Sequence, residues 1–404
     1  MPTAPPVAPP WVAPRAAYVH VPFCAHHCGY CDFAVATGAD DRIDAYVAAV
    51  ERELELLLGE PRAVETIFVG GGTPTYLTAG QLDRLLSVIN HWLPLQAHPR
   101  RRVGEITHPP PRVGFEGVEF SIESTPDSLT ADKVAVLADH GVTRVSVGVQ
   151  SFDPRALAVL ERVHAPADVP RAVDCVRRRV DNVSLDLIFG VPGQSLADWD
   201  ADLKRALELN PDHISTYGLT YETGTRLWKQ RRRGLVTALD EDAELALYLH
   251  ALDTLAAAGY RRYEVSNHAR PGRDCRHNQT YWANWAYFGF GVGAARYVGG
   301  TRELNTRSLP TYLDRIAAGR PAAFQSETLG PGERARETIS TQLRRAEGIS
   351  RDQFREQTGY DLDALAGPKV RRHVATGLLA DDGRSVALTR AGVCVADSLI
   401  ADLM

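Results

Sequence analysis

Apolar and polar positions follow two alternating periods along the first half of the chain. Amphipathic stretches, typical of helices, occupy residues 41–58, 81–92, 131–140 and 196–209, and more helical sequence runs up to residue 179. Short apolar runs, typical of buried strands, lie between them at residues 16–21, 66–69, 117–122, 142–149, 183–189 and 214–219. Such a succession predicts six βα units and a parallel sheet with right-handed crossovers. Periodicity leaves open whether the sheet is doubly wound or a partial barrel of the (βα)8 kind.

Two later segments depart from this alternation. Residues 96–114 hold a histidine, arginines and several prolines, so we expect an exposed insertion there. Residues 240–258 predict another helix, and an aromatic, glycine-rich stretch follows at residues 260–300.

The last part of the chain predicts a separate, mostly helical unit. Helical patterns lie near residues 333–344, 351–357 and 369–376, and a two-stranded wing around residues 381–383 precedes a final helix. This order resembles a winged-helix module. The predicted organisation is therefore a disordered tail, a βα core, a linking region and a terminal module, at residues 1–15, 16–240, 241–325 and 326–404.

Composition narrows the possible partners and compartments. The 404 residues are 44% hydrophobic and 24% charged, with a net charge of −5, and binding to nucleic acid phosphates usually requires a basic excess. No apolar run is long enough to predict a membrane-spanning helix. Residues 1–14 are rich in proline and alanine but lack a basic start and an apolar core, so we expect a tail rather than a secretion signal. These features predict a cytoplasmic protein that does not bind nucleic acid.

Three of the six cysteines lie close together, as Cys24, Cys28 and Cys31, just after the first predicted strand. Three thiolates on one loop can bind three irons of a [4Fe-4S] cluster and leave the fourth iron open to a small chelating ligand. A structural zinc site normally closes its shell with a fourth ligand, which His26 or His27 could supply. The spacing favours the cluster.

The residues around these cysteines carry a family resemblance. The segment Tyr-Val-His-Val-Pro-Phe-Cys-Ala-His-His-Cys-Gly-Tyr-Cys-Asp-Phe, residues 18–33, resembles the radical S-adenosylmethionine superfamily. More narrowly, it is similar to oxygen-independent coproporphyrinogen III oxidases and their HemW-type relatives. This resemblance implies a partial (βα)6 barrel, a [4Fe-4S] cluster and bound S-adenosylmethionine, which is cleaved by an electron from the cluster.

Polar residues and glycines follow the predicted strands, where parallel α/β folds place their ligands. An acidic side chain can pair with the ammonium of S-adenosylmethionine and an arginine with its carboxylate, although singly such charges are more often solvated or structural. The resemblance implies that the matching positions contact S-adenosylmethionine. They are Tyr18, Tyr30, Gly71, Gly72, Thr73, Glu123, Gln150, Arg162 and Asp186, with Gly218 and Ala295 as weaker matches.

Two features separate heme binding from porphyrinogen oxidation. The related oxidases carry a cysteine two positions after the third cluster ligand, where this chain has Phe33, and they have more sequence before the position of Tyr18. In addition, His277-Asn-Gln-Thr-Tyr281-Trp282 is similar to the His-Asn-x-x-Tyr-Trp motif of HemW-type proteins, which bind heme and pass it on. On residue chemistry alone, a buried histidine beside core aromatic rings is the favoured explanation of the motif.

The resemblance therefore favours a heme chaperone with a [4Fe-4S] cluster, S-adenosylmethionine and heme as its cofactors, and with His277, Tyr281 and Trp282 at the heme. Its expected partners are acceptor hemoproteins, membrane-associated ones among them, and a homodimer is left open. The alternative is an enzyme, the oxygen-independent coproporphyrinogen III oxidase. Arginine runs at residues 177–179 and 231–233 offer further contacts for an acidic partner, although such runs are usually solvated.

Overall fold

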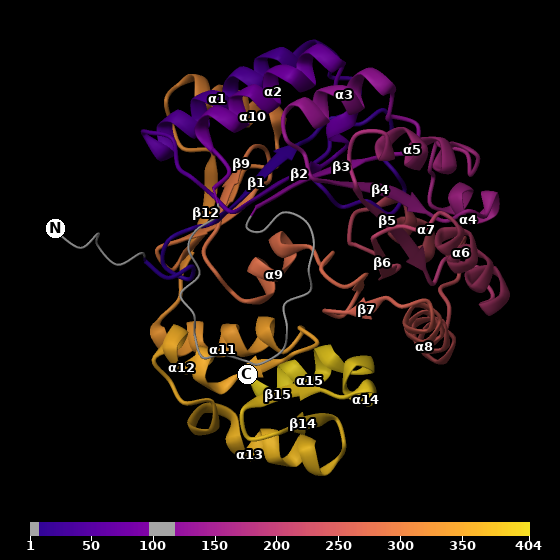
Figure 1. Cartoon of the computed structure of the whole chain (residues 1–404), viewed down its shortest axis with the longest axis vertical. Helices are drawn as coiled ribbons and strands as arrows, with labels where there is room; N and C mark the ends of the chain where they lie inside the picture. The colour runs from indigo at the N-terminus through magenta and orange to yellow at the C-terminus, as the bar shows by residue number, and fades with distance from the viewer. Residues whose placement is uncertain (1–7, 97–117) are drawn as a thin grey trace.

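The computed structural model describes residues 8–96 and 118–404, and its largest element is a nine-stranded sheet (Figure 1). Six of its strands are parallel and lie side by side in the order of the chain. They are β1 (Ala16–Val21), β2 (Thr66–Gly71), β3 (Glu119–Ser124), β4 (Arg144–Gln150), β5 (Asn182–Phe189) and β6 (His213–Gly218). The six predicted units are thus confirmed.

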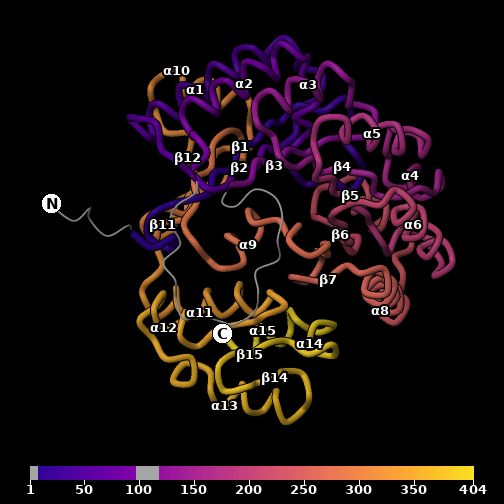
Figure 2. The backbone as a smooth tube through the Cα atoms, viewed as in Figure 1, coloured from indigo at the N-terminus to yellow at the C-terminus, as the bar shows by residue number. Residues whose placement is uncertain are grey.

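This strand order decides between the two predicted architectures. In a doubly wound sheet, the order in which strands are added reverses at the first strand, so the connecting helices lie on both faces. Here each right-handed crossover moves the same way, which places the connecting helices on one face and curls the sheet into a barrel. Figures 1 and 2 show these helices along the outer arc: α1 (Ile43–Leu58), α2 (Ala79–Trp92), α3 (Ala131–Asp139), α5 (Asp168–Arg177) and α6 (Leu196–Glu208).

The barrel is partial, since its two edges are extended by different strands. At one edge β9 (Phe288–Phe290) pairs in parallel with β1. At the other edge β8 (Asn267–Ala269) pairs antiparallel with β6, and β7 (Arg261–Arg262) pairs with β8. The sheet therefore continues past residue 240. The preceding helix is α8 (Glu241–Ala257), and α9 (Arg276–Trp282) lies on the concave side (Figure 1).

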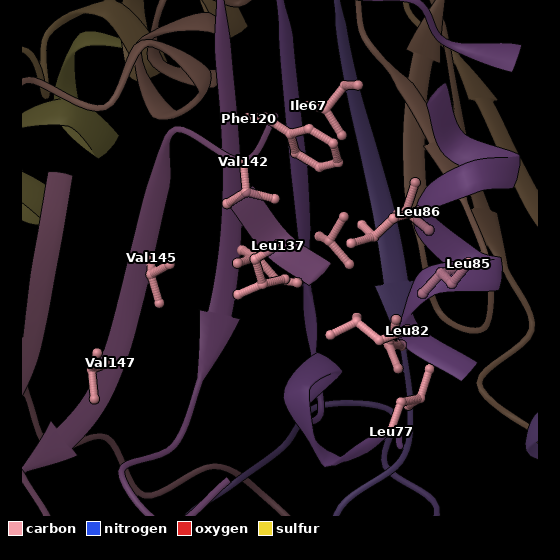
Figure 3. Packing of buried hydrophobic residues seen from close by; sticks show 14 of the residues in the cluster. Ile67, Leu77, Leu82, Leu85, Leu86, Phe120, Leu137, Val142, Val145 and Val147 are labelled. Atoms are coloured by element: carbon pink, nitrogen blue, oxygen red, sulfur yellow. The ribbon is translucent and has the colours of Figure 1, made fainter. Parts of the chain in front are cut away.

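The two faces of the sheet differ in chemistry. Every second residue of the strands is apolar and packs against the outer helices, as Phe120 and Val145 do near Leu82 and Leu137 (Figure 3). The alternate residues point into the barrel and are largely polar, with pairs such as Arg144 and Ser146 on one strand. The interior is therefore suited to binding a polar ligand.

The rest of the chain forms a small antiparallel sheet and a terminal module. The small sheet contains β10 (Ala295–Val298), β11 (Thr301–Asn305) and β12 (Ala323–Thr328), and α10 (Leu309–Ala317) contacts α1. Short helices α4 (Pro154–Val159) and α7 (Arg226–Arg232) follow β4 and β6. The module consists of α11 (Pro331–Gln342), β13 (Ile349–Ser350), α12 (Arg351–Thr358), α13 (Leu362–Ala375), β14 (Leu379–Asp381), β15 (Ser385–Leu388), α14 (Arg390–Cys394) and α15 (Ala396–Leu403).

The module has the predicted helix-and-wing order, with two differences. Its wing has three strands rather than two, because the two-residue strand β13 pairs with β15. Helix α13 begins at Leu362, not at residue 369, and continues through Gly367 and Pro368. Both residues disfavour a helix interior, so local sequence indicates a later start than the packed structure adopts.

Two further expectations concern the amino-terminal residues 1–15 and the segment at residues 96–114. The expected insertion at residues 96–114 lies almost wholly outside the described residues. Of the expected tail, residues 1–7 are also outside them, whereas residues 8–15 pack on the barrel, where the carbonyl of Pro10 accepts a 3.0 Å hydrogen bond from the Ala286 amide. No helix in the described ranges is long and apolar enough to cross a membrane.

Candidate functional site

The cysteine loop leaves the carboxyl end of β1. Cys24, Cys28 and Cys31 are half-buried and form no disulfide. The thiol of Cys24 lies 3.3 Å from the hydroxyl of Thr73, and the Cys31 amide donates to the Cys28 carbonyl at 3.2 Å. Burial raises the pKa values of Cys24 and Cys31 to about 11. These thiols will ionise readily only beside a cationic centre, as they do on binding iron.

The rest of the loop has partners of its own. His27 Nε2 lies 3.0 Å from the Cys31 carbonyl, and His26 lies 3.9 Å from Glu161. The Gly29 amide donates to Leu160, and the Gly29 carbonyl accepts from the Leu227 amide at 2.8 Å. The loop is thus held from both sides by backbone hydrogen bonds.

The described ranges hold no group of three His, Cys, Asp or Glu side chains close enough to bind one metal ion.

The glycines after β2 let two loops approach each other closely. Gly71 has φ +111°, and a side chain there would overlap the ring of His20. A Cβ on Gly72 would lie 2.8 Å from the backbone oxygens of Pro22 and Phe23. These glycines therefore have a packing role beside the cysteine loop, whether or not their amides also contact a ligand. The Gly71 amide already donates a 2.8 Å hydrogen bond to Glu123.

Two acidic side chains face each other inside the barrel. Burial raises the pKa of Glu123 to about 7, and the neighbouring carboxylate of Asp186 adds to this effect. Asp186 accepts hydrogen bonds from Ser146 at 2.9 Å and from Ser215 at 2.7 Å, while its own pKa is raised by burial. A cationic ligand would offset the cost of burying both carboxylates.

Arg162 links the cysteine loop to the strand ends. Its Nη1 lies 3.5 Å from the Cys28 sulfur, and its Nη2 donates to the Gly148 carbonyl at 2.8 Å. Its Nε is buried and has no hydrogen-bond partner among the described residues, so a donor remains available for an anionic group. Tyr30 packs beside this arginine against a small apolar cluster that includes Leu160.

The remaining predicted contacts lie at the ends of the next strands. Gln150 ends β4 with a φ of 64°, a conformation that is unusual for a residue other than glycine. Gly218 ends β6, where a Cβ would lie 3.3 Å from the ring of Phe189. The structure thus brings the residues predicted to contact S-adenosylmethionine to one end of the barrel. The exceptions are Tyr18 and Asp186, which lie within β1 and β5 rather than at their ends, and Ala295.

Tyr18 and Ala295 line a separate cavity of about 500 Å³. Its walls come from β1, α9 and the loop after it, the small sheet, and α11 of the terminal module. The lining residues are Tyr18, Tyr281, Trp282, Asn284, Tyr287, Ala295, Arg302, Glu337, Ser340 and Thr341. The volume lies within the range of small-molecule sites, and tyrosine and tryptophan form much of the wall.

His277 lies behind this cavity rather than in it. Its Nδ1 is 2.9 Å from the Thr66 hydroxyl and its Nε2 is 2.7 Å from the Tyr281 hydroxyl, so both ring nitrogens are engaged. Burial lowers the pKa of His277 to about 3. The backbone amide donates to Glu119 at 3.1 Å. In this arrangement the imidazole positions Tyr281 and has no nitrogen free to bind iron.

Several residues at these sites escaped the sequence analysis. The Nδ1 of His20 lies 2.9 Å from the Tyr18 hydroxyl. Its position two residues after Tyr18 on the same strand could have indicated that both side chains point to the same face. Ser146 and Ser215 could be found by the same alternation. Arg302 and Glu337, which form an ion pair at the cavity wall, gave no local signal because they belong to different elements.

Known families match most of the chain. The radical SAM superfamily model matches residues 18–206, and the HemN C-terminal domain model matches residues 329–395. The first match contains the cysteine loop and strands β1 to β5, and the second contains most of the terminal module.

Curated relatives align over nearly the full length. The chain is 34% identical over 382 residues to "Heme chaperone HemW" of Bacillus subtilis (strain 168), covering 94% of this chain and 96% of the relative. It is 32% identical over 392 residues to the protein of the same name from Escherichia coli (strain K12), covering 96% and 97%.

A solved structure supports the fold. Coproporphyrinogen III oxidase (HemN) from Escherichia coli, described as a radical SAM enzyme, superposes with a TM-score of 0.80, covering 96% of this chain and 89% of that chain. At 22% identity this likeness concerns the fold alone. The full-length relatives at 30% identity or more, together with the cysteine loop, identify the chain as a member of the heme chaperone HemW family within the radical SAM superfamily.

Proposed function

We propose that this protein binds heme in the cavity between α9 and α11 and transfers it to acceptor hemoproteins. The observation that carries this proposal is the cavity of about 500 Å³ with Tyr281 and Trp282 in its wall. Flat aromatic rings pack well against a porphyrin, and Arg302 offers a cation for its carboxylates. The name of the relatives points to the same function.

The cluster and S-adenosylmethionine belong at the carboxyl ends of the strands. Burial raises the pKa values of Tyr18 and Tyr281 in the cavity wall, and both lie close enough to Glu123 for its charge to add to this effect. Cys24, Cys28 and Cys31 would hold a [4Fe-4S] cluster, since their thiols are free and lie on one loop. When bound, the cluster supplies an electron-transfer centre and an open iron site for a chelating ligand. Glu123 and Asp186 would face the ammonium and ribose of S-adenosylmethionine. Arg162, with its unpartnered Nε, would face the carboxylate.

We further infer that the protein works in the cytoplasm, where clustered thiols remain reduced and available for iron. The acceptors would then include hemoproteins that are reached from that side of the membrane. Transfer requires the heme to leave as well as to enter. Part of the cavity wall, Glu337, Ser340 and Thr341, belongs to α11 of the terminal module, so a shift of this helix would open the cavity.

A heme titration of the anaerobically reconstituted protein tests the proposal. We expect Trp282→Ala and Tyr281→Ala to weaken heme binding by about tenfold or more, since each removes an aromatic wall of the cavity. Trp228→Ala, on the distant helix α7, is the matched control and should leave the affinity unchanged. Heme uptake that is equal in all four proteins would contradict the assignment of this cavity.

The second candidate, oxygen-independent coproporphyrinogen III oxidase, is favoured by one observation: most of the residues expected to contact S-adenosylmethionine lie around the carboxyl ends of the strands. Against it, Phe33 stands where the oxidases have a cysteine, and its side chain is 61% exposed at the end of the cysteine loop. Anaerobic incubation with S-adenosylmethionine, a reductant and coproporphyrinogen III decides between the two. Formation of decarboxylated product would establish the oxidase activity.

A further inference from the structure

Helix α7 lies directly against the cysteine loop. Its second residue, Leu227, donates its amide to the Gly29 carbonyl at 2.8 Å, and Gly29 follows the cluster ligand Cys28. The Leu227 side chain is buried with Leu160 in the apolar cluster beside Tyr30. At the start of the helix, Arg226 forms a 2.8 Å ion pair with Glu161. These contacts fix α7 as the outer neighbour of the cluster site.

The exposed side of this helix is strongly cationic. Arg226, Lys229, Arg231, Arg232 and Arg233 lie within eight consecutive positions, and all five are exposed. Arg231 lies over the ring of Tyr221 at 4.5 Å, and Arg232 over the ring of Trp228 at 4.9 Å. Stacking holds these two side chains in place, so less side-chain conformational entropy is lost when a partner binds.

Most of these cations have no carboxylate partner. Among the described residues, Lys229, Arg232 and Arg233 form no ion pair, whereas Arg226 pairs with Glu161. Burial raises the pKa of the Glu244 carboxyl, and Arg231 lies close enough to offset this effect in part. A chain with a net charge of −5 thus concentrates free positive charge at this surface. Such a surface favours an acidic partner by charge complementarity and speeds the encounter with it.

The chain also contains a second arginine run, which serves as a comparison. Residues 177–179 begin at the last residue of α5 and precede β5, so they lie at the amino-terminal end of the strands. The cysteine loop lies at the opposite, carboxyl-terminal end. Helix α7 follows β6 and contacts the cysteine loop through the Leu227 amide. The two runs therefore have similar charge, but only the α7 run lies on an element that adjoins the cluster site.

We propose that the cationic face of α7, formed by Lys229, Arg231, Arg232 and Arg233, is the docking surface for an acidic one-electron carrier protein that reduces the cluster. This inference rests on the proposed cluster. In the step, the reduced carrier loses one electron and the oxidised cluster gains one, and no bond forms or breaks in either protein. The heme cavity lies elsewhere, between α9 and α11, so carrier and heme can bind at the same time.

The test uses an acidic bacterial flavodoxin as the probe and the reconstituted full chain. Arg232→Glu/Arg233→Glu is compared with Arg178→Glu/Arg179→Glu, which changes the charge equally at the other run. Fluorescence anisotropy of the flavin gives the affinity, and anaerobic stopped-flow absorbance gives the rate of cluster reduction. Reduction by dithionite, a small ion, reports whether the cluster itself is intact.

We expect the α7 variant to bind flavodoxin about tenfold more weakly at low ionic strength and the other variant to change by less than about twofold. The difference should vanish near 1 M salt, where the Debye length is about 3 Å. Dithionite reduction and heme uptake should remain unchanged in both variants.

Equal affinities for the two variants would overturn the proposal, as would binding of anionic lipid vesicles through α7 without binding of flavodoxin. Since affinity is measured separately from reduction, a variant with a damaged cluster still reports on docking. Failure of the wild-type chain to assemble a cluster would instead contradict the proposed function, so the two failures are distinguishable.

Discussion

The cysteine loop takes its three thiols from eight consecutive positions, whereas the aromatic cavity takes its walls from segments between Tyr18 and Thr341. The loop is anchored by backbone hydrogen bonds to Leu160 and Leu227 and by the glycine turn after β2, so only its thiols are local in the sequence. The cavity exists only when β1, α9, the small sheet and α11 are all in place. A local site tolerates distant change, but an assembled site depends on packing throughout the protein.

The two regions also differ in what their histidines and acids do. Inside the barrel, burial raises the pKa values of the Glu123 and Asp186 carboxyls, and the buried cation of Arg144 offsets this effect only in part. At the cavity, His277 is fully engaged by Thr66 and Tyr281, so its polar groups are satisfied. The first region is therefore arranged for a charged ligand, and the second for an apolar, planar one.

The largest expected effect breaks the cluster and leaves the cavity intact. Cys28→Ala should abolish incorporation of the [4Fe-4S] cluster, since two thiolates cannot replace three, and heme affinity should change by less than about twofold. Iron and sulfide analysis and a heme titration on one sample measure both. Cys175→Ala, a half-buried cysteine outside the loop, is the control. A parallel loss of heme binding would show that the two regions are coupled.

A smaller effect is expected from the histidine behind the cavity. His277→Ala removes two hydrogen bonds and a buried ring, and should lower the free energy of unfolding by about 2–4 kcal/mol. Tyr281→Phe removes only the hydroxyl and should cost about 1 kcal/mol. Urea unfolding measures both. An unchanged free energy of unfolding in His277→Ala would contradict this structural role.

The same histidine gives the stability a defined pH dependence. Its pKa is lowered to about 3 in the folded protein, from about 6.5 when unfolded. The unfolded chain takes up this proton first, so stability is complete above about pH 6.5 and falls as the pH drops towards 3. His277→Ala should lack this part of the acid sensitivity.

The smallest expected effect concerns Glu123, whose pKa is raised to about 7. The ammonium of S-adenosylmethionine requires the carboxylate form, so affinity should rise as the pH rises, and at pH 6 it should be about tenfold below its value at pH 8. Glu123→Gln should bind more weakly and with a flat profile. Calorimetry in two buffers would detect the proton released. A wild-type profile without slope would remove Glu123 from the ligand contacts.

The sequence predicted the barrel well because its strands are long enough to show a pattern. Strand β1 has the predicted bounds, and the contacts of Gly71 with Glu123 and of Cys24 with Thr73 agree with the rule that strand ends gather ligands. The partial barrel and the family are confirmed. Strands β7 and β13 have two residues each, too few to show any period, and were missed.

The cavity could not be predicted from sequence for a related reason. Trp282 lies 5.8 Å from the guanidinium of Arg344, and Asn284 donates to Thr338 at 3.0 Å, yet nothing in the local sequence of α9 indicates that α11 lies opposite. The motif around His277 showed that the segment matters. Only packing shows that the histidine faces Thr66 and that the tryptophan lines the cavity. The assignment of heme to this site remains a prediction.

The parallel pairing of β1 with β9 has a consequence for synthesis of the chain. The first strand has its second neighbour about 270 residues later, at Phe288–Phe290. Until those residues leave the ribosome, one edge of β1 has unpaired backbone groups, which invite pairing with other chains. Such distant contacts slow folding. A fragment ending near residue 240 would keep this open edge and should aggregate, although it contains the cysteine loop and all six parallel strands.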